Sequence, residues 1–351
     1  MQQKAFNLIA RAKIMANIRK WFEKNHFIEV ETPILVDCPD LSPNLNILKT
    51  EITPSQRRQP NFKMLRKYLI TSPEFSMKKI LALPASPQSH PHSMLGGLNN
   101  IYTITKVFRD GEEDTGIHSI EFTLLEWYRK NADYRDMMRD TEELLRSFAK
   151  FEDTKIQLLD ETPFPRLKVS NLFKKYAKIE NIEKTSLSMF KKIIYQREYS
   201  RDKNLNYEQC FNLIFLNEVE PKLPKNPFFL IDYPAPLAAL ARLKKENPFI
   251  AERFELYVNG IELCNGFSEL TNGKEQLARF KQENLERKRM GKSGLPIDYE
   301  LCDKLDLIST GAAQDYVSPN KALAKAGGNA LGIDRLVMIL LGANSIDKVM
   351  Y

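Results

Sequence analysis

The stretch Glu255-Leu-Tyr-Val-Asn-Gly-Ile-Glu-Leu263 places an Asn-Gly pair between two runs of alternating polar and apolar residues. Asn259-Gly260 is a strong signal for a two-residue β-hairpin, because a type I′ turn requires a positive φ at both central positions. Pairing across this turn sets Tyr257 opposite Glu262. The stretch therefore predicts two adjacent antiparallel strands.

The two faces of the hairpin differ in character, because successive side chains of a strand point to opposite faces. The apolar face is expected to carry Leu256, Val258, Ile261 and Leu263, and the other face Glu255, Tyr257, Glu262 and Cys264. The following Asn265-Gly-Phe-Ser-Glu269 adds an amide and a third carboxylate, with Gly266 as a plausible bulge. Either the acids form a solvated outer face, or they hold Mg²⁺, which prefers carboxylate oxygens and shares its other positions with phosphates.

The composition of the 351 residues is that of a globular protein, with 43% hydrophobic and 28% charged residues. The four cysteines are too scattered for a zinc site or a disulfide framework, so a reducing cytoplasm is expected. No run of about 18 uncharged apolar residues predicts a membrane span. The net charge of +7 arises from mixed charges without the basic stripe of a nucleic-acid module. The first 22 residues could imitate a mitochondrial presequence, but an amphipathic helix is the preferred interpretation.

The order of the predicted elements favours an α+β fold. Helices are predicted at 4–24, 72–83, 134–151, 273–291 and 333–341, with two or three more within 170–217. Strands are predicted at 28–32, 101–108, 122–128 and 228–233, besides the hairpin. The segments 84–100 and 309–328 are expected to be long loops. Because strands and helices lack the regular spacing of parallel βαβ units, a doubly wound fold is disfavoured. We expect a single domain, 1–351, with a helical insertion at about 150–225.

Common phosphate-binding and nucleophile signatures are absent from the sequence. Gly291-Lys-Ser293 resembles the end of a P-loop, but Glu286 occupies the position of the required first glycine. There is no Gly-x-Gly-x-x-Gly, no Gly-x-Ser-x-Gly and no His-Glu-x-x-His. If the chain uses ATP, it binds the nucleotide by another design.

Two arginines and one aromatic residue stand at predicted element ends. Arg109 ends a strand beside a loop, where its planar fork can bind a phosphate. Arg335 lies in the first turn of the last helix, where the helix dipole disfavours a cation. It could pair with Asp334 or with a bound polyphosphate. Phe122 could stack on a purine, although a buried strand Phe is the commoner case.

Thr71-Ser-Pro-Glu74 has the composition of a helix start. Ser72 suits the N-cap, Pro73 suits the first helical position, and Glu74 suits the positive end of the helix dipole. On local grounds alone these residues predict a cap.

Together these segments resemble the three signature motifs of the class II aminoacyl-tRNA synthetases, in their lysyl-type form. The first motif would be the N-terminal helix with Glu29-Val-Glu-Thr-Pro33, the second Phe108-Arg109 through Glu121-Phe-Thr-Leu-Leu-Glu-Trp-Tyr-Arg129, and the third Gly328-Asn-Ala-Leu-Gly-Ile-Asp-Arg335. The resemblance spans nearly the whole chain. It implies the class II synthetase catalytic fold, an antiparallel sheet flanked by helices, and a homodimer formed through the first motif.

Two features resemble a truncated paralogue family, the elongation factor P–(R)-β-lysine ligases. Lysyl-tRNA synthetases carry an anticodon-binding OB-fold before the first motif, whereas here the motif begins almost at Met1, so no anticodon reading is expected. Ala330 stands where lysyl-tRNA synthetases usually have Gly. Its methyl group would crowd an α-amino group and leave room for a β-amino group. The resemblance implies activation of (R)-β-lysine, or lysine, with ATP and transfer to a lysine side chain of elongation factor P.

The resemblance also assigns roles to individual residues. Arg109 and Arg335 would be catalytic, at the α-phosphate and the γ-phosphate, and Arg335 would sandwich adenine against Phe122. The ATP-binding positions would be Arg109, Glu112, His118, Ser119, Phe122, Glu262, Leu263, Gly332 and Arg335. The amino-acid positions would be Ser72, Pro73, Glu74, Glu126, Tyr128, Asn265, Glu269 and Ala330. The metal ligands for Mg²⁺ would be Glu255 and Glu262. No covalent nucleophile is needed, because catalysis would rest on positioning and electrostatics.

The sequence departs from the family pattern in several places. Its second-motif loop reads Arg-Asp-Gly-Glu-Glu, one residue longer than the usual Arg-Asn-Glu-Glu, so Glu112 is assigned by counting back from His118. Ser119 stands where the family commonly has Asn. The loops at 84–100 and 309–328 are longer than expected, which bears on the amino-acid substrate and the docking surface. A lysine-activating ligase for tRNA or another acceptor is the nearest alternative. A catalytically inactive regulatory paralogue is disfavoured, because both arginines and the acids are retained.

Overall fold

The computed structural model describes residues 2–52, 65–81, 98–111, 116–149, 151, 163–310 and 325–350. The strands of its main sheet are β1 (Ile28–Glu29), β5 (Asn100–Phe108), β6 (Glu121–Lys130), β7 (Arg166–Lys168), β8 (Phe228–Pro234), β9 (Ile250–Val258), β10 (Ile261–Ser268) and β11 (Ala326–Gly332). They lie in the order β1-β5-β6-β11-β10-β9-β8-β7. The two edge pairs, β1 with β5 and β7 with β8, are parallel, and all inner pairs are antiparallel.

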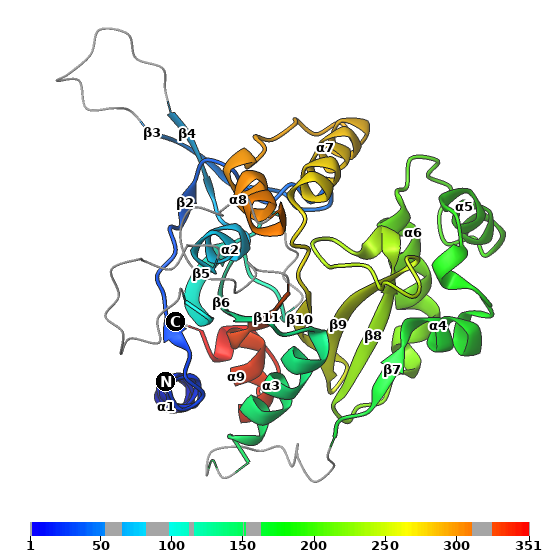
Figure 1. The fold of residues 1–351 in the computed structure, drawn as a ribbon. Helices are drawn as coiled ribbons and strands as arrows, with labels where there is room; N and C mark the ends of the chain where they lie inside the picture. The colour runs from blue at the N-terminus through cyan, green and yellow to red at the C-terminus, as the bar shows by residue number, and fades with distance from the viewer. Residues whose placement is uncertain are drawn as a thin grey trace, which may run out of the picture.

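Helices and a small second sheet surround the main sheet (Figure 1). The helices are α1 (Gln2–Lys24), α2 (Glu74–Leu81), α3 (Tyr134–Arg146), α4 (Val169–Leu172), α5 (Leu187–Gln196), α6 (Tyr207–Ile214), α7 (Gly273–Arg289), α8 (Tyr299–Thr310) and α9 (Ile333–Leu341). Short 3₁₀ and π turns are η1 (Phe173–Ala177), η2 (Ile182–Lys184), η3 (Phe215–Val219), η4 (Glu220–Lys222), η5 (Ala235–Leu237) and η6 (Ile346–Lys348). The second sheet has the order β2 (Leu35–Val36), β4 (Leu65–Leu69), β3 (Lys49–Ile52). The predicted α+β fold is confirmed.

The alternation of β6 divides the main sheet into a core face and a polar face. Leu125 and Trp127 are fully buried in the largest hydrophobic cluster, to which α1, α3 and α9 contribute. Glu126 and Tyr128 point to the other face, where Tyr128 packs against Met77 of α2. Because side chains alternate along a strand, one apolar face anchors the sheet while the other face is free to carry polar groups.

The central strand β11 is the largest difference from the sequence prediction, which expected a loop from 309 to 328. Its Ala-Gly-Gly-Asn-Ala-Leu-Gly sequence lacks the β-branched residues that mark strands. The glycines allow close approach instead: a Cβ on Gly327 would lie 2.8 Å from Met137 Cγ and 3.0 Å from the Asp133 carbonyl oxygen. A glycine within a strand often marks such an approach, and here α3 begins directly over β11.

Other predicted boundaries shift by a few residues. β1 ends at Glu29 rather than at 32, although the Val30 amide still donates to Tyr102 O at 2.8 Å. The predicted helices at 72–83, 134–151 and 273–291 are α2, α3 and α7, which begin or end two to five residues inside those limits. The last helix ends as predicted at Gly342, which adopts φ 60°. Residues 84–97 and 311–324 of the two predicted loops lie outside the described residues, as do residues 82 and 83 at the end of the predicted helix 72–83.

The hairpin forms, with a bulge in a different place from the prediction. Asn259 and Gly260 have φ of 54° and 77°, as a type I′ turn requires. The register shifts between Glu262 and Cys264, so Leu256 pairs with Cys264 rather than with Leu263. The bulge at Leu263, not at Gly266, allows both Leu263 and Cys264 to enter the hydrophobic core. The prediction that Cys264 shares a face of the hairpin with the acids is therefore wrong.

The same bulge brings another side chain to the polar face. Asn265 pairs with Glu255 across the hairpin and takes the place predicted for Cys264. A bulge adds one residue to one strand, so every side chain beyond it changes face relative to an unbroken ladder.

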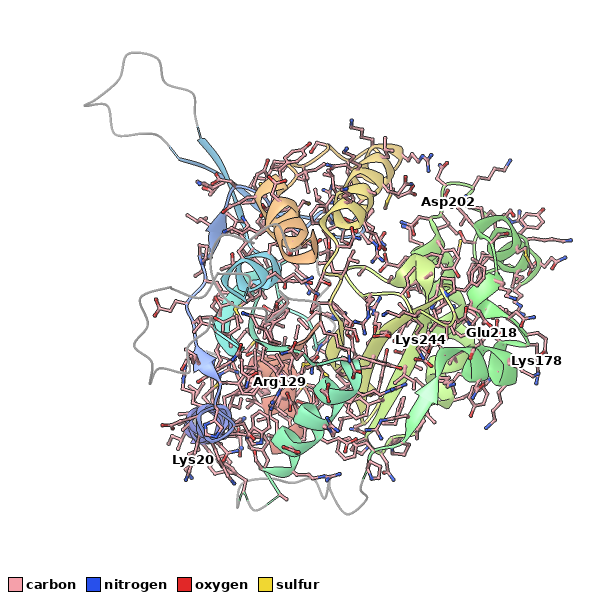
Figure 2. The ribbon with its side chains drawn as sticks, viewed as in Figure 1. Lys20, Arg129, Lys178, Asp202, Glu218 and Lys244 are labelled. Carbon is pink, nitrogen blue, oxygen red and sulfur yellow. The ribbon has the colours of Figure 1, made fainter. Side chains whose placement is uncertain are left out.

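The segment between β7 and β8 is helical, as predicted for 170–217. Its helices form a separate hydrophobic cluster with stacked rings, such as Phe173 on Phe211 at 4.7 Å, packed against β8. Figure 2 labels Lys178 and Glu218 there, at the opposite end of the sheet from Lys20 on α1. That this segment is an insertion into a single domain stays a prediction. No helix in the described part of the chain is long and apolar enough to cross a bilayer.

Candidate active site

A cavity of about 1110 Å³ lies on the polar face of the sheet. The predicted site residues in its wall are Ser72, Glu74, Arg109, His118, Ser119, Phe122, Glu126, Tyr128, Glu255, Glu262, Leu263, Asn265, Glu269, Ala330, Gly332 and Arg335. Pro73 is buried at the start of α2 and is not part of the wall. Glu112 lies outside the described residues. The volume exceeds that of most single-ligand pockets, so a nucleotide and an amino acid can occupy it together.

The floor of the cavity is one row of side chains across four strands. The pairing registers align Glu126 of β6, Ala330 of β11, Asn265 of β10 and Glu255 of β9. Because β11 supplies only a methyl group here, the acids on either side border open space. The sequence indicated the residue types, whereas the row itself depends on strand pairing between segments far apart in the chain.

One end of the cavity holds three carboxylates. Glu126 is 1% exposed and accepts hydrogen bonds from Ser72 Oγ at 2.9 Å and Tyr128 Oη at 2.7 Å. Glu269, 2% exposed, follows β10, and Glu74 begins α2. Ser72 Oγ also accepts a hydrogen bond from the Glu74 amide at 3.2 Å, so the predicted helix cap forms. The hydroxyl proton of Ser72 is donated to Glu126.

Lys78, which the sequence motifs did not single out, lies among these carboxylates. Its Nζ is 2.7 Å from Glu74 Oε1 and 2.5 Å from Glu269 Oε2, and its side chain is 2% exposed. The four-residue spacing from Glu74 to Lys78 is an ordinary surface pair on most helices, so it carried no signal by itself. Only the fold places Glu269 against the same ammonium.

Burial governs the charge state of the acidic end. Burial, followed by repulsion from Glu74, raises the pKa of Glu126 to about 8. Burial also raises the pKa of Glu269 to about 8, although Lys78 opposes the shift. The pKa of Glu74 is raised by burial as well. Burial would lower the pKa of Lys78, but Glu269 and Glu74 outweigh it and raise that pKa. A ligand that brings positive charge stabilises the ionised forms of these carboxyl groups, so this end of the cavity favours such a ligand.

Arg109 and Phe122 lie together in the wall of the same cavity. The Arg109 guanidinium carbon is 5.1 Å from the centre of the Phe122 ring, a cation–π arrangement. Arg109 Nε is buried, and no described residue accepts a hydrogen bond from it. A buried donor without an acceptor is unfavourable unless a ligand supplies one. The arrangement fits an anion such as a phosphate.

Arg335 projects from the first turn of α9 towards the hairpin. It donates to Glu262 O at 2.8 Å and to Ile117 O at 3.2 Å, and its Nη2 lies 2.8 Å from His118 Nε2. Asp334 binds Arg11 at 2.6 Å, so the alternative that it pairs with Arg335 is wrong. These contacts link the second motif, the hairpin and the last helix at the cavity wall.

Glu255 and Glu262 lie on the same face of the hairpin. Glu255 contacts Arg253 at 2.8 Å and accepts from Tyr257 Oη at 3.2 Å. Burial, followed by repulsion from Glu255, raises the pKa of Glu262 to about 7, while Arg335 opposes the shift. No set of three or more His, Cys, Asp or Glu side chains arranged for a metal occurs in the described part of the chain. The two carboxylates fit Mg²⁺ that takes its other oxygens from phosphates and water.

The cavity therefore has two chemically different ends. The arginines suit the phosphates of a nucleotide, and the acids suit ammonium groups. The far face of β6 is structural: Figure 2 labels Arg129 near α3, where it binds Asp140 at 2.6 Å and lies over Phe27 at 4.7 Å. One ligand carboxylate between the two ends could meet a phosphorus atom held by the arginines.

Comparisons with known proteins identify the family of this chain. The family model for tRNA synthetases class II (D, K and N) matches residues 2–351. The elongation factor P–(R)-β-lysine ligase of Pasteurella multocida is 36% identical over 348 residues, which are 98% of this chain and 94% of the relative. The ligase of the same name from Vibrio cholerae is 36% identical over 97% of this chain and 92% of the relative.

A third relative, from Salmonella paratyphi B, carries the same name and is 34% identical over 98% of this chain and 93% of its own length. The matched residues include all the strands and helices that form the cavity. The chain therefore belongs to the class II tRNA synthetase family of the D, K and N type, and its near full-length relatives carry the name elongation factor P–(R)-β-lysine ligase.

Proposed function

We propose that this chain is an ATP-dependent ligase that activates (R)-β-lysine as its adenylate and transfers it to a lysine side chain of elongation factor P. The observation that carries the proposal is one cavity with arginines at one end and three carboxylates at the other. Relatives named for this reaction match nearly the whole chain, which supports the same chemistry here.

The first step joins the amino acid to AMP. A carboxylate oxygen of the amino acid bonds to the α-phosphorus of ATP, and the bond to pyrophosphate breaks. Arg109, whose buried Nε has no acceptor among the described residues, stabilises the charge on the α-phosphate. Arg335 binds the γ-phosphate and encloses adenine with Phe122. Glu255 and Glu262 would hold Mg²⁺, which would supply neutralising charge to the phosphates.

The second step forms the amide. The uncharged amine of the acceptor lysine bonds to the carbonyl carbon of the adenylate, and AMP leaves with the electron pair of the broken C–O bond. The amine releases one proton to solvent. No protein side chain becomes covalently attached, so the enzyme acts by holding the reacting atoms together.

The acidic end favours a substrate with two ammonium groups. Glu126 and Glu269 both lie at this end of the cavity, and Tyr128 and Ser72 donate hydrogen bonds that orient Glu126. Ala330 lies in the row between Glu126 and Asn265, so its methyl group is beside the substrate backbone. This placement supports the preference for a β-amino over an α-amino group.

The test is intact-mass measurement of elongation factor P after incubation with the enzyme, ATP, Mg²⁺ and one amino acid. We expect a gain of one lysyl residue with (R)-β-lysine and little gain with α-lysine, and Arg109→Ala should abolish the gain. Unchanged mass with every amino acid, together with charging of tRNA by α-lysine, would favour the alternative of a lysyl-tRNA synthetase-like ligase.

Two further parts of the proposal concern assembly and location. Exposed apolar side chains on α1 and the following segment support a homodimer through the first motif: Phe6, Ile9, Ile28, Ile34 and Leu35 are each 41–60% exposed. A substrate that is a translation factor supports a cytoplasmic location for the enzyme.

A further inference from the structure

Lys78 is almost completely enclosed and has two carboxylate partners. The side chain is 2% exposed, its Nζ lies within 2.7 Å of both Glu74 and Glu269, and Phe267 lies beneath it at 5.8 Å. A buried ammonium is unfavourable unless it is paired, so its position is determined by these two acids. The two acids are held by Lys78 in turn, because its ammonium joins α2 to the residue that follows β10.

Lys78 and the three carboxylates around it form a group whose charges do not cancel. Glu74, Glu126 and Glu269 supply three negative charges and Lys78 one positive charge, which leaves this group of four at −2 when all are ionised. Asp40 and Glu283 line the same cavity and add negative charge near Glu74. A diamino acid brings two ammonium groups. With Lys78 the charges balance, whereas without it one buried carboxylate would lack a partner even when the substrate is bound.

The geometry leaves specific oxygens for the substrate. Lys78 uses Oε2 of Glu269, while Oε1 is buried and has no hydrogen-bond donor among the described residues. That oxygen borders Gly328, where a Cβ would lie only 2.2 Å away. A buried carboxylate oxygen without a donor, on a side chain that lines the cavity, is an acceptor that a ligand ammonium group can satisfy.

On this basis, and resting on the proposed diamino-acid substrate, we infer that Lys78 is a positioning and specificity residue. Its ammonium orients Glu74 and Glu269 and fixes the net charge of the pocket, so that the site accepts a substrate with two ammonium groups. Lys78 contacts neither ATP nor the reacting carboxylate in this role. Its effect should therefore be confined to amino-acid recognition.

The test is ATP–pyrophosphate exchange by Lys78→Met at saturating ATP, with wild-type exchange on (R)-β-lysine measured first. We expect the amino-acid KM to rise about tenfold, equivalent to about 1.4 kcal/mol of binding, with kcat and the KM for ATP nearly unchanged. The pH midpoint of the amino-acid KM should also move up by about one unit, because a cation that favours the ionised acids has been removed. A merely structural role would leave this midpoint unmoved.

Lys79→Met is the matched control on the same helix. Lys79 pairs with Asp298 at 2.8 Å and Glu300 at 3.0 Å, away from the three carboxylates, so its amino-acid KM and pH midpoint should match wild type. A Lys78→Met enzyme with wild-type KM and midpoint would overturn the inference. Absence of wild-type exchange with any diamino acid would instead refute the proposed function.

Lys78→Arg decides the case if Lys78→Met does not fold, as judged by loss of ATP binding. Arginine keeps the charge but its planar fork does not fit the space of an ammonium. We expect the pH midpoint to stay at the wild-type value while the amino-acid KM rises severalfold. An unchanged KM would show that the exact placement of the cation is irrelevant and would overturn the positioning role.

Discussion

Gly328 illustrates how a single residue limits the shape of the pocket. A Cβ added there would lie 2.2 Å from Glu269 Oε1 and 2.5 Å from Tyr128 Cε1. Both atoms belong to buried groups that border the substrate space, so neither can move without disturbing the acids. The residue is therefore constrained by close approach within a strand and not by a left-handed backbone.

We predict that Gly328→Ala raises the amino-acid KM at least about tenfold, because the methyl group displaces the Glu269 carboxylate from its ligand position. The KM for ATP should change little. Exchange kinetics with each substrate varied in turn provide the measurement. Gly294→Ala is the control: its Cβ would meet no atom closer than 3.5 Å. Equal amino-acid KM values for the two variants would contradict the prediction.

At the scale of elements, the first helix and the last helix are joined by one buried ion pair. Arg11 of α1 lies 2.6 Å from Asp334 Oδ1 of α9, and Asp334 Oδ2 accepts from the Thr123 amide of β6 at 2.6 Å. The Asp334 side chain is 4% exposed. Arg335, the next residue in the sequence, lies in the cavity wall. The Arg11–Asp334 pair therefore holds in place the first turn of α9, from which this proposed catalytic arginine projects.

Breaking this pair should destabilise the fold, because the remaining buried charge loses its partner. We expect Arg11→Met to lower the free energy of unfolding by about 3 kcal/mol. Arg19→Met on the same helix removes an exposed pair with Glu29 and should lower it by less than about 1 kcal/mol. Urea unfolding of both variants measures the difference. Similar losses in the two variants would contradict the expected effect of burial.

At the scale of the whole molecule, the acidic end makes amino-acid binding depend on pH. Burial raises the pKa of Glu126 to about 8, which favours its protonated form in the ligand-free enzyme at neutral pH, whereas at Glu269 the Lys78 ammonium opposes the upward shift that burial causes. A diammonium substrate requires the ionised forms. We therefore predict that the amino-acid KM falls as the pH rises through about 8, while the lysine-type amines stay protonated up to about pH 10. Exchange kinetics at saturating ATP give this profile.

The raised pKa values of Glu126 and Glu269 also determine how the stability of the folded protein changes with pH. A carboxyl whose pKa rises on folding stabilises the folded state fully only below its ordinary value of 4.5 and loses that contribution as the pH rises through about 8. Unfolding of the ligand-free enzyme should thus become easier across this range, and Glu126→Gln should reduce the loss. A flat KM profile with unchanged stability would show that these acids are ionised throughout.

Local chemistry in the sequence determined several parts of this protein. Asn259-Gly260 specified the hairpin because its turn geometry requires positive φ at two residues. Residues 122–128 were predicted to form a strand and residues 333–341 the last helix, and both elements occur in the structure as β6 and α9. The hairpin and these elements reflect properties of neighbours in the chain. The resemblance to the class II synthetases, rather than local chemistry, indicated the sixteen described residues that line one cavity.

Contacts between distant segments were decided only by the tertiary structure. Lys78 became a pocket residue because β10 brings Glu269 to it, and β11 became a strand because its glycines fit under α3 and beside Glu269. The bulge at Leu263, which exchanges Cys264 for Asn265 beside Glu255, formed because two side chains could enter the core together. The packing energy of a residue depends on contacts with residues that are far away in the sequence. A local sequence pattern therefore cannot predict it.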